Sequence, residues 1–108
     1  MKQKEDSKYL LQGHKLLAQR NYEGALSEYE KVLSLSPSKA QEAEVFFNMG
    51  LIYAHYGYPK RDYKKSLNFF IKILNDYPES PFFEQAKIWI GVLQEHRQIS
   101  QMIEKLKQ

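Results

Sequence analysis

Apolar residues recur along this chain every three or four positions, which is the spacing of one face of an α-helix. In the first stretch this stripe consists of Leu10, Leu11, Leu16 and Leu17. The same spacing returns four more times, and it predicts helices at about 6–19, 22–34, 40–56, 63–75 and 82–108. The chain is therefore predicted to be all-α.

Turn-forming residues separate these segments. Pro37 and Pro78 end the second and fourth helices, because the residue before a proline disfavours helical geometry. Asn21 and Ser80 are the predicted N-caps of the second and last helices. A longer turn, centred on 57–61, separates the third helix from the fourth.

Three glycines lie inside otherwise good helical patterns, at Gly13, Gly50 and Gly91. A glycine within a helix costs about 1 kcal/mol relative to alanine. Because glycine recurs at three equivalent helix positions in spite of this cost, we predict that another helix approaches closely at each of the three glycines.

The spacing of these glycines and the prolines indicates an internal repeat. Pro37 to Gly50 and Pro78 to Gly91 are both 13 residues, whereas Gly13 to Pro37 is 24 and Gly50 to Pro78 is 28. The second unit therefore matches the first with four residues added, and we expect them in the longer turn.

The two units resemble the tetratricopeptide repeat, a helix–turn–helix of about 34 residues with aromatic, Gly, Ala and Pro residues at fixed offsets. In the first unit the matching residues are Tyr9, Gln12, Gly13, Leu16, Ala25, Tyr29, Val32 and Pro37. In the second they are Phe46, Met49, Gly50, Tyr53, Ser66, Phe70, Ile73 and Pro78. The departures are Gln12 for Leu, and Ser66 and Ile73 for Ala.

A third unit is only half present, because Gln94 stands where the pattern has a Tyr-like residue and no turn follows. The resemblance thus implies a single domain, an α-solenoid of two helix hairpins and a long C-terminal capping helix. The first repeat covers about 6–39, the second about 40–80 and the capping helix about 81–108.

The junction at 76–91 is similar to the "YPxSPxxxxAxxxLG" segment of bacterial envelope repeat proteins, such as the outer-membrane assembly lipoprotein and the Tol–Pal accessory protein. This resemblance implies a periplasmic or envelope-associated protein, with the cytoplasm as the alternative. The charged start, MKQKEDSKYL, shows no signal peptide.

In the tetratricopeptide family the first helix of each unit lines a concave groove, and the resemblance carries this role onto eleven positions. These are Leu10, His14, Leu17, Ala18, Phe47, Leu51, Ala54, His55, Ile88, Val92 and His96. Such an apolar surface predicts an adaptor or scaffold that binds a peptide or an amphipathic helix of another protein. The alternative is a homo-oligomerisation module, in which a second copy or the chain's own C-terminal helix covers the groove.

Some family members clamp a C-terminal carboxylate with Lys, Asn and Arg side chains. The corresponding places here hold Leu10, His14, Asn48, Gln85 and Trp89, and only Asn48 matches. We therefore do not expect a carboxylate clamp.

Composition narrows the function further. The chain has 108 residues, a net charge of +3 and no cysteine, which excludes disulfides and thiolate chemistry. No apolar run approaches the roughly 18 residues of a membrane span. The three histidines show no metal-ligand spacing, so we expect neither a metal nor another cofactor. Without a nucleophile elbow or a Gly-rich phosphate loop, the chain is not expected to be an enzyme.

Two further clusters have alternative interpretations. Aromatic and basic residues alternate at Tyr56, Tyr58, Lys60, Arg61, Tyr63, Lys64 and Lys65. This pattern could serve an RNA-contacting adaptor, but a tyrosine-packed turn beside a solvated helix is favoured, and no nucleic-acid partner is expected. Ile99, Met102, Ile103 and Leu106 could pack back on the repeats or begin a coiled coil.

Overall fold

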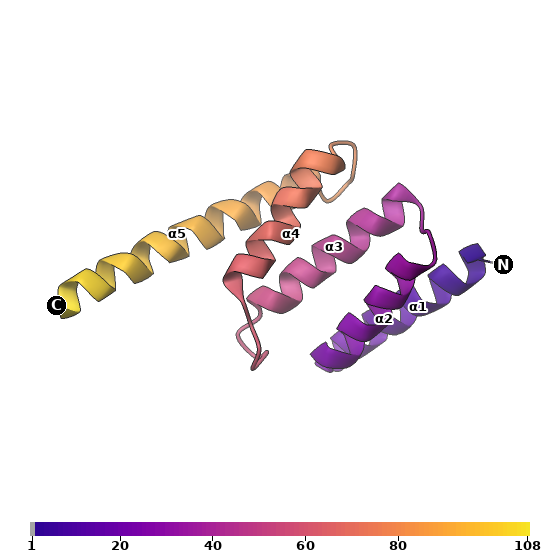
Figure 1. The fold of residues 1–108 in the computed structure, drawn as a ribbon, viewed down its shortest axis with the longest axis horizontal. Helices are drawn as coiled ribbons and strands as arrows, with labels where there is room; N and C mark the ends of the chain where they lie inside the picture. Colours follow the sequence, from indigo (N-terminus) through magenta and orange to yellow (C-terminus); the bar gives the residue numbers. More distant parts are fainter. Residues whose placement is uncertain (1) are drawn as a thin grey trace.

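The computed structural model describes residues 2–108, and side chains from residue 5 onwards. Five α-helices and no strand occur in this range, which confirms the all-α prediction (Figure 1). The helices are α1 (Lys2–Ala18), α2 (Tyr22–Ser34), α3 (Lys39–Ala54), α4 (Tyr63–Asp76) and α5 (Phe83–Lys107).

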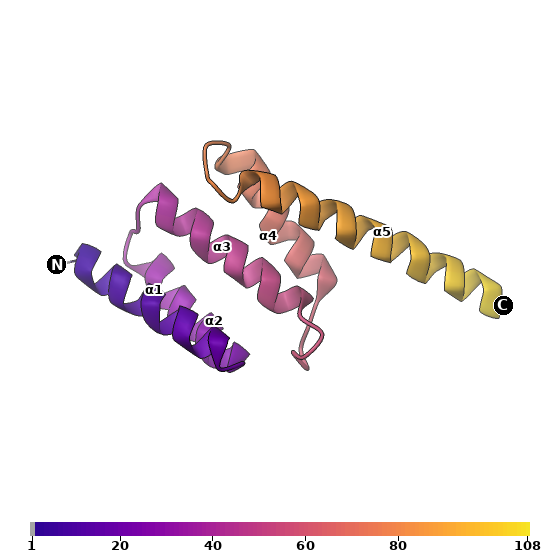
Figure 2. The ribbon, with the colours of Figure 1, turned by 180° about the vertical axis from the view of Figure 1, so that it is seen from behind.

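Consecutive helices pack against one another in chain order. Contacts join α1 to α2, α2 to α3, α3 to α4 and α4 to α5. The result is two antiparallel hairpins, α1–α2 and α3–α4, followed by α5 (Figures 1 and 2). The molecule is elongated, with extents of 58 × 29 × 18 Å. Figure 2 shows that the C-terminal half of α5 projects past the other helices.

The two hairpins close in the same way, with a glycine of the first helix against an aromatic ring of the second. A Cβ atom on Gly13 would lie 2.5 Å from Cε1 of Tyr29, and one on Gly50 would lie 2.8 Å from Cε1 of Phe70. Both rings are fully buried. A side chain at either glycine would therefore push the helices apart, which confirms the predicted close approach at these two positions.

The same prediction is wrong at Gly91, where an added Cβ would meet nothing within 4 Å. Gly91 lies on α5, and no helix follows α5 among the described residues. The partner that gives Gly13 and Gly50 their role is thus not present at Gly91.

Equivalent backbone hydrogen bonds frame the turns of the two hairpins. The amide of Asn21 donates to the carbonyl of Leu16 at 2.8 Å, and the amide of Asp62 donates to the carbonyl of Tyr53 at 2.8 Å. The residues of the first pair are five positions apart in the sequence, and those of the second pair are nine positions apart. The four extra residues of the second unit therefore lie between these closing points. Arg20 turns the first hairpin in the left-handed region, with φ 62°.

Side chains cap α2, α3 and α4, and the cap of α3 is Ser38, whose hydroxyl oxygen accepts from the amide of Gln41 at 3.1 Å. Asn21 accepts from the amide of Gly24 at 2.9 Å, which confirms it as the N-cap of α2. Asp62 caps α4 in the same manner, accepting from the amide of Lys65 at 3.1 Å.

The predicted cap at Ser80 is wrong. The N-cap of α5 is Phe82, which makes no side-chain cap hydrogen bond. Ser80 instead belongs to a separate turn before the helix: its hydroxyl oxygen accepts from the amide of Phe82 at 3.1 Å, and its own amide donates to the carbonyl of Tyr77 at 3.0 Å.

Candidate functional site

A cleft of about 490 Å³ opens between the last turns of α1 and α3 and the first half of α5. Its walls are mostly apolar. The lining residues are Leu17, Ala18, Arg20, Tyr22, Leu51, Ala54, His55, Tyr56 and Trp89. Five of the predicted groove residues, namely Leu17, Ala18, Leu51, Ala54 and His55, are thus brought together around one cavity.

Trp89 forms the α5 side of the cleft. Its ring lies nearly parallel to that of Phe70, with centroids 6.1 Å apart and an interplanar angle of 10°. Because Phe70 is itself fixed in the core, the indole is held in place while part of it stays exposed. The family resemblance places Trp89 only at a carboxylate-clamp position, although Trp89 directly follows Ile88, a predicted groove residue of the third unit.

The other six predicted groove residues lie elsewhere, and four of them are apolar. Phe47 is only 5% exposed, since its ring stacks on Phe82 at 4.8 Å and meets the edge of Phe70 at 5.5 Å, so it offers almost no surface to a ligand. Leu10 packs against the core and is partly buried. Ile88 and Val92 are exposed on α5 without lining the cleft.

His14 uses both ring nitrogens to join three helices. Nδ1 lies 2.7 Å from the hydroxyl of Tyr29 on α2, and Nε2 lies 2.6 Å from Oε2 of Glu44 on α3. Burial raises the pKa of Tyr29, and the charge of Glu44 acts in the same direction. The phenol therefore stays protonated, so a hydroxyl group faces Nδ1 of His14 while the Glu44 carboxylate faces Nε2. With both nitrogens engaged and Tyr29 fully buried, this cluster fixes the helices and presents no free base or nucleophile.

His55 and Tyr56 form the rim of the cleft. The amide of Gly57 donates to Nδ1 of His55 at 2.9 Å, and the hydroxyl of Tyr22 lies 3.1 Å from the same atom. The ring of Tyr56 stacks on His55 at 4.8 Å, although Tyr56 is 77% exposed. This aromatic pair lies at the edge of the apolar walls.

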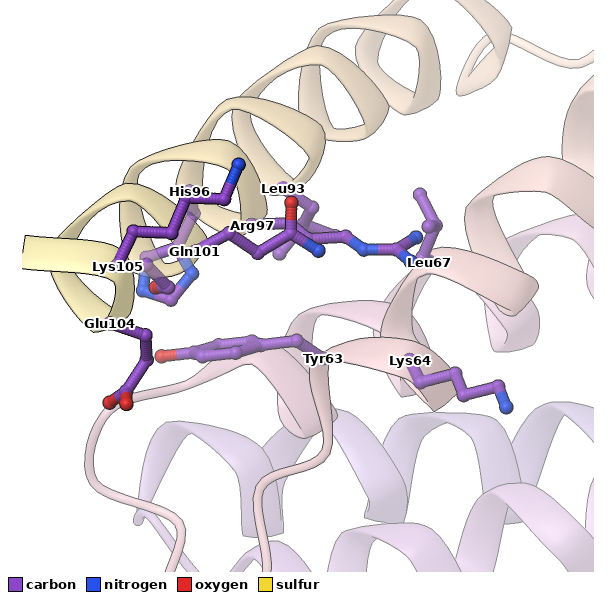
Figure 3. Close-up of a pocket in the computed structure, with 10 residues that line it drawn as sticks. Tyr63, Lys64, Leu67, Leu93, His96, Arg97, Gln101, Glu104 and Lys105 are labelled. Atoms are coloured by element: carbon purple, nitrogen blue, oxygen red, sulfur yellow. The ribbon is translucent and has the colours of Figure 1, made fainter. Parts of the chain in front are cut away.

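His96, the remaining predicted residue, belongs to a second and larger cleft of about 740 Å³ between α4 and α5 (Figure 3). Its ring meets the edge of Tyr63 at 4.7 Å. Tyr63, Leu67 and Leu93 give this cleft apolar surface. Its other lining residues are Lys64, His96, Arg97, Ser100, Gln101, Glu104 and Lys105, whose aliphatic stems add to that surface while their polar ends can reach water.

The turn of α3–α4 is packed by tyrosine. Tyr58 is 3% exposed and donates to Oε1 of Glu23 at 2.8 Å, with Nζ of Lys60 3.5 Å from the same oxygen. The hydrogen bond from Tyr58, and then the charge of Lys60, lower the pKa of Glu23. These two members of the aromatic and basic cluster are thus engaged with α2.

Within residues 2–108, no helix is both long and apolar enough to cross a membrane. No group of three or more potential metal ligands gathers in that part of the chain. No family model, no curated protein and no solved structure matches the chain. The assignment of a function therefore depends on the residues and the geometry described above.

Proposed function

We propose that the chain is a tetratricopeptide-like α-solenoid unit that binds a short apolar segment of another protein in the cleft lined by Leu17, Leu51 and Trp89. The observation that carries the proposal is this cleft, which is open, largely apolar and built from residues of four helices. At about 490 Å³ it falls in the range of roughly 300–1,000 Å³ that holds specific ligands.

The walls suggest the kind of segment that would fit. Leu17, Ala18, Leu51 and Ala54 offer aliphatic surface, and Trp89 offers an aromatic face. Polar groups lie only at the rim, where Arg20 and His55 can meet the backbone or a polar flank of the ligand. A few apolar side chains on one face of a helix or an extended peptide match this arrangement. The envelope setting is a separate part of the proposal and is supported by the 76–91 junction alone.

The proposal can be tested with a random peptide library displayed on phage and selected against the immobilised chain. The affinity of an enriched peptide is then measured by fluorescence polarisation. Ala18→Glu and Ala54→Glu place a carboxylate on the cleft wall while removing little packing, because Ala18 is exposed and Ala54 partly so. Each should weaken binding at least tenfold.

Gln12→Glu is the matched control, since Gln12 is exposed on α1 and does not line the cleft. It should leave the affinity unchanged. If no peptide is enriched, or if the cleft variants bind as tightly as the control, the cleft is not the binding site.

A homo-oligomerisation module is the second candidate, and a different observation favours it. Five large apolar residues of α5 from Val92 onwards are exposed: Val92, Ile99, Met102, Ile103 and Leu106. Exposed apolar surface of this extent on one helix marks an interaction site.

A further inference from the structure

The apolar face of α5 changes side along the helix. In the first half Ala86 and Leu93 are buried, and Trp89 and Ile90 pack against the core. In the second half the apolar residues face away from the molecule. Together with two residues of the first half they form what we term the outer stripe: Ile88, Val92, Ile99, Met102, Ile103 and Leu106, each between 47% and 82% exposed. At 3.6 residues per turn these six side chains fall within an arc of about 100°.

The outer stripe is not placed to receive a further helix of the same repeat. In α3 three aromatic residues face the following helix: Phe46 and Tyr53 stack on Phe69, at 5.9 Å each, and Phe47 meets the edge of Phe70 at 5.5 Å. The repeat spacing puts Lys87, Gln94 and Ile88 at the equivalent positions of α5. Two of these three positions are polar and only Ile88 belongs to the outer stripe, so the rest of the stripe requires an occupant of another kind.

We infer that the outer stripe pairs with α5 of a second copy of this chain, and that the two helices run antiparallel. Residues 88, 92, 95, 99, 102 and 106 follow one another at intervals of four and three, which is the seam of a two-stranded coiled coil. Five of these six positions are apolar. The exception is Glu95, and it decides the orientation.

In a parallel pair each seam residue faces its own counterpart, so the two Glu95 carboxylates would be opposed across an apolar seam. Like charges in such a place are strongly unfavourable. In an antiparallel pair each residue faces a different one, and Glu95 lies opposite Ile99 of the second copy. The antiparallel arrangement therefore removes the direct opposition of like charges.

A two-fold axis at the level of Arg97 pairs the seam residues with one another. Ile88 then lies opposite Leu106 of the second copy, Val92 lies opposite Met102, and Ile99 lies opposite Glu95. Ile103 lies beside this seam and widens its apolar edge.

The size of this interface sets the expected strength of pairing. The outer stripe spans 19 residues, or about 28 Å at a rise of 1.5 Å per residue. The surface that one helix face of that length can bury is smaller than the roughly 800 Å² that each partner buries in a standard interface. We therefore expect a reversible dimer in the micromolar range of chain concentration.

Sedimentation equilibrium between about 5 and 500 µM tests the pairing. The parent chain should shift from monomer to dimer over this range, whereas the double variant Ile99→Asp/Ile103→Asp should stay monomeric. The control Gln94→Asp/Gln101→Asp adds the same charge to polar, exposed positions of α5 and should dimerise like the parent. A monomeric parent at every concentration would overturn the inference, as would a stripe variant that dimerises normally.

Single cysteines test the orientation, because the chain has none of its own. Gln98→Cys lies beside the two-fold axis and should form a disulfide-linked dimer under mild oxidation. Met102→Cys should not, because the two copies of residue 102 lie about 15 Å apart along an antiparallel pair. The reverse result would show a parallel pair. The outer stripe does not line the cleft, so Ile99→Asp/Ile103→Asp should still bind a cleft peptide, and the two proposals stand or fall separately.

Discussion

Replacing glycine by alanine at Gly13, Gly50 and Gly91 makes the same chemical change at three matching helix positions. At Gly91 the new methyl group meets open space. Only the difference in helix propensity then acts, which favours alanine by about 1 kcal/mol. We expect Gly91→Ala to raise the free energy of unfolding by about that amount.

At Gly50 the same gain is opposed by a clash. The new Cβ would lie 2.8 Å from two carbons of the Phe70 ring, and that ring is packed between Phe47 and Trp89. Overpacking a filled core costs roughly 1–3 kcal/mol. The net effect of Gly50→Ala is a loss of about 0–2 kcal/mol, and Gly13→Ala should behave likewise, since its Cβ would lie 2.5 Å from the Tyr29 ring.

Urea unfolding followed by circular dichroism measures this difference. With a slope of about 1–3 kcal/mol per molar urea, a change of 1 kcal/mol moves the midpoint by roughly 0.3–1 M. The measurements are made at low micromolar concentration, so that pairing through α5 does not contribute. A Gly91→Ala variant less stable than the parent, or a Gly50→Ala variant stabilised as much as Gly91→Ala, would refute the reasoning.

Three further predictions concern hydrogen bonds, ionisation and backbone strain. His14→Ala removes the hydrogen-bond partner of the buried Tyr29 hydroxyl and should cost about 1–3 kcal/mol in urea unfolding; His14→Ala/Tyr29→Phe should recover part of that loss, and no recovery would assign the loss to packing. Burial and the bond to Glu23 raise the pKa of Tyr58. The unfolded phenol ionises near pH 10 while the folded one stays neutral. The contribution of Tyr58 to the free energy of unfolding should therefore be complete below about pH 10 and decrease above it. Tyr58→Phe should make this decrease less steep, and an unchanged slope between pH 9 and 11 would contradict the prediction. Arg20 has φ 62°, a backbone conformation that glycine adopts without strain. Arg20→Gly should therefore raise the free energy of unfolding by roughly 0.5–1 kcal/mol, measured as a higher thermal midpoint. A lowered midpoint would show that the contacts of the Arg20 side chain stabilise the fold by more than the backbone strain destabilises it.

The helices were predictable from the sequence because their signals are local. Pro37 and Pro78 stop helices wherever they occur, and Asn21 needs only its own amide neighbours to act as a cap. The contacts of Gly13 and Gly50 followed from spacing, since each has a matching aromatic residue in the next helix. For these elements, the information needed lies within one helix or one hairpin.

The failures concern residues whose role is set by distant parts of the chain. Gly91 resembles Gly50 in its own helix, but no following helix packs against it. Phe47 occupies a groove position, yet Phe82 covers it from 35 residues away. His14 was assigned to the groove, yet its two ring nitrogens contact Tyr29 on α2 and Glu44 on α3. No periodicity within a single helix contains these contacts.

Trp89 has a practical consequence, because it is the single tryptophan of the chain and it stands in the wall of the cleft. Intrinsic fluorescence excited at the indole band therefore reports from that wall and from no other place in the molecule. A peptide entering the cleft would displace water from the ring, shift its emission to shorter wavelength and shield it from quenching by iodide. The chain thus carries its own optical probe of cleft occupancy, and ligands can be titrated without attaching a dye.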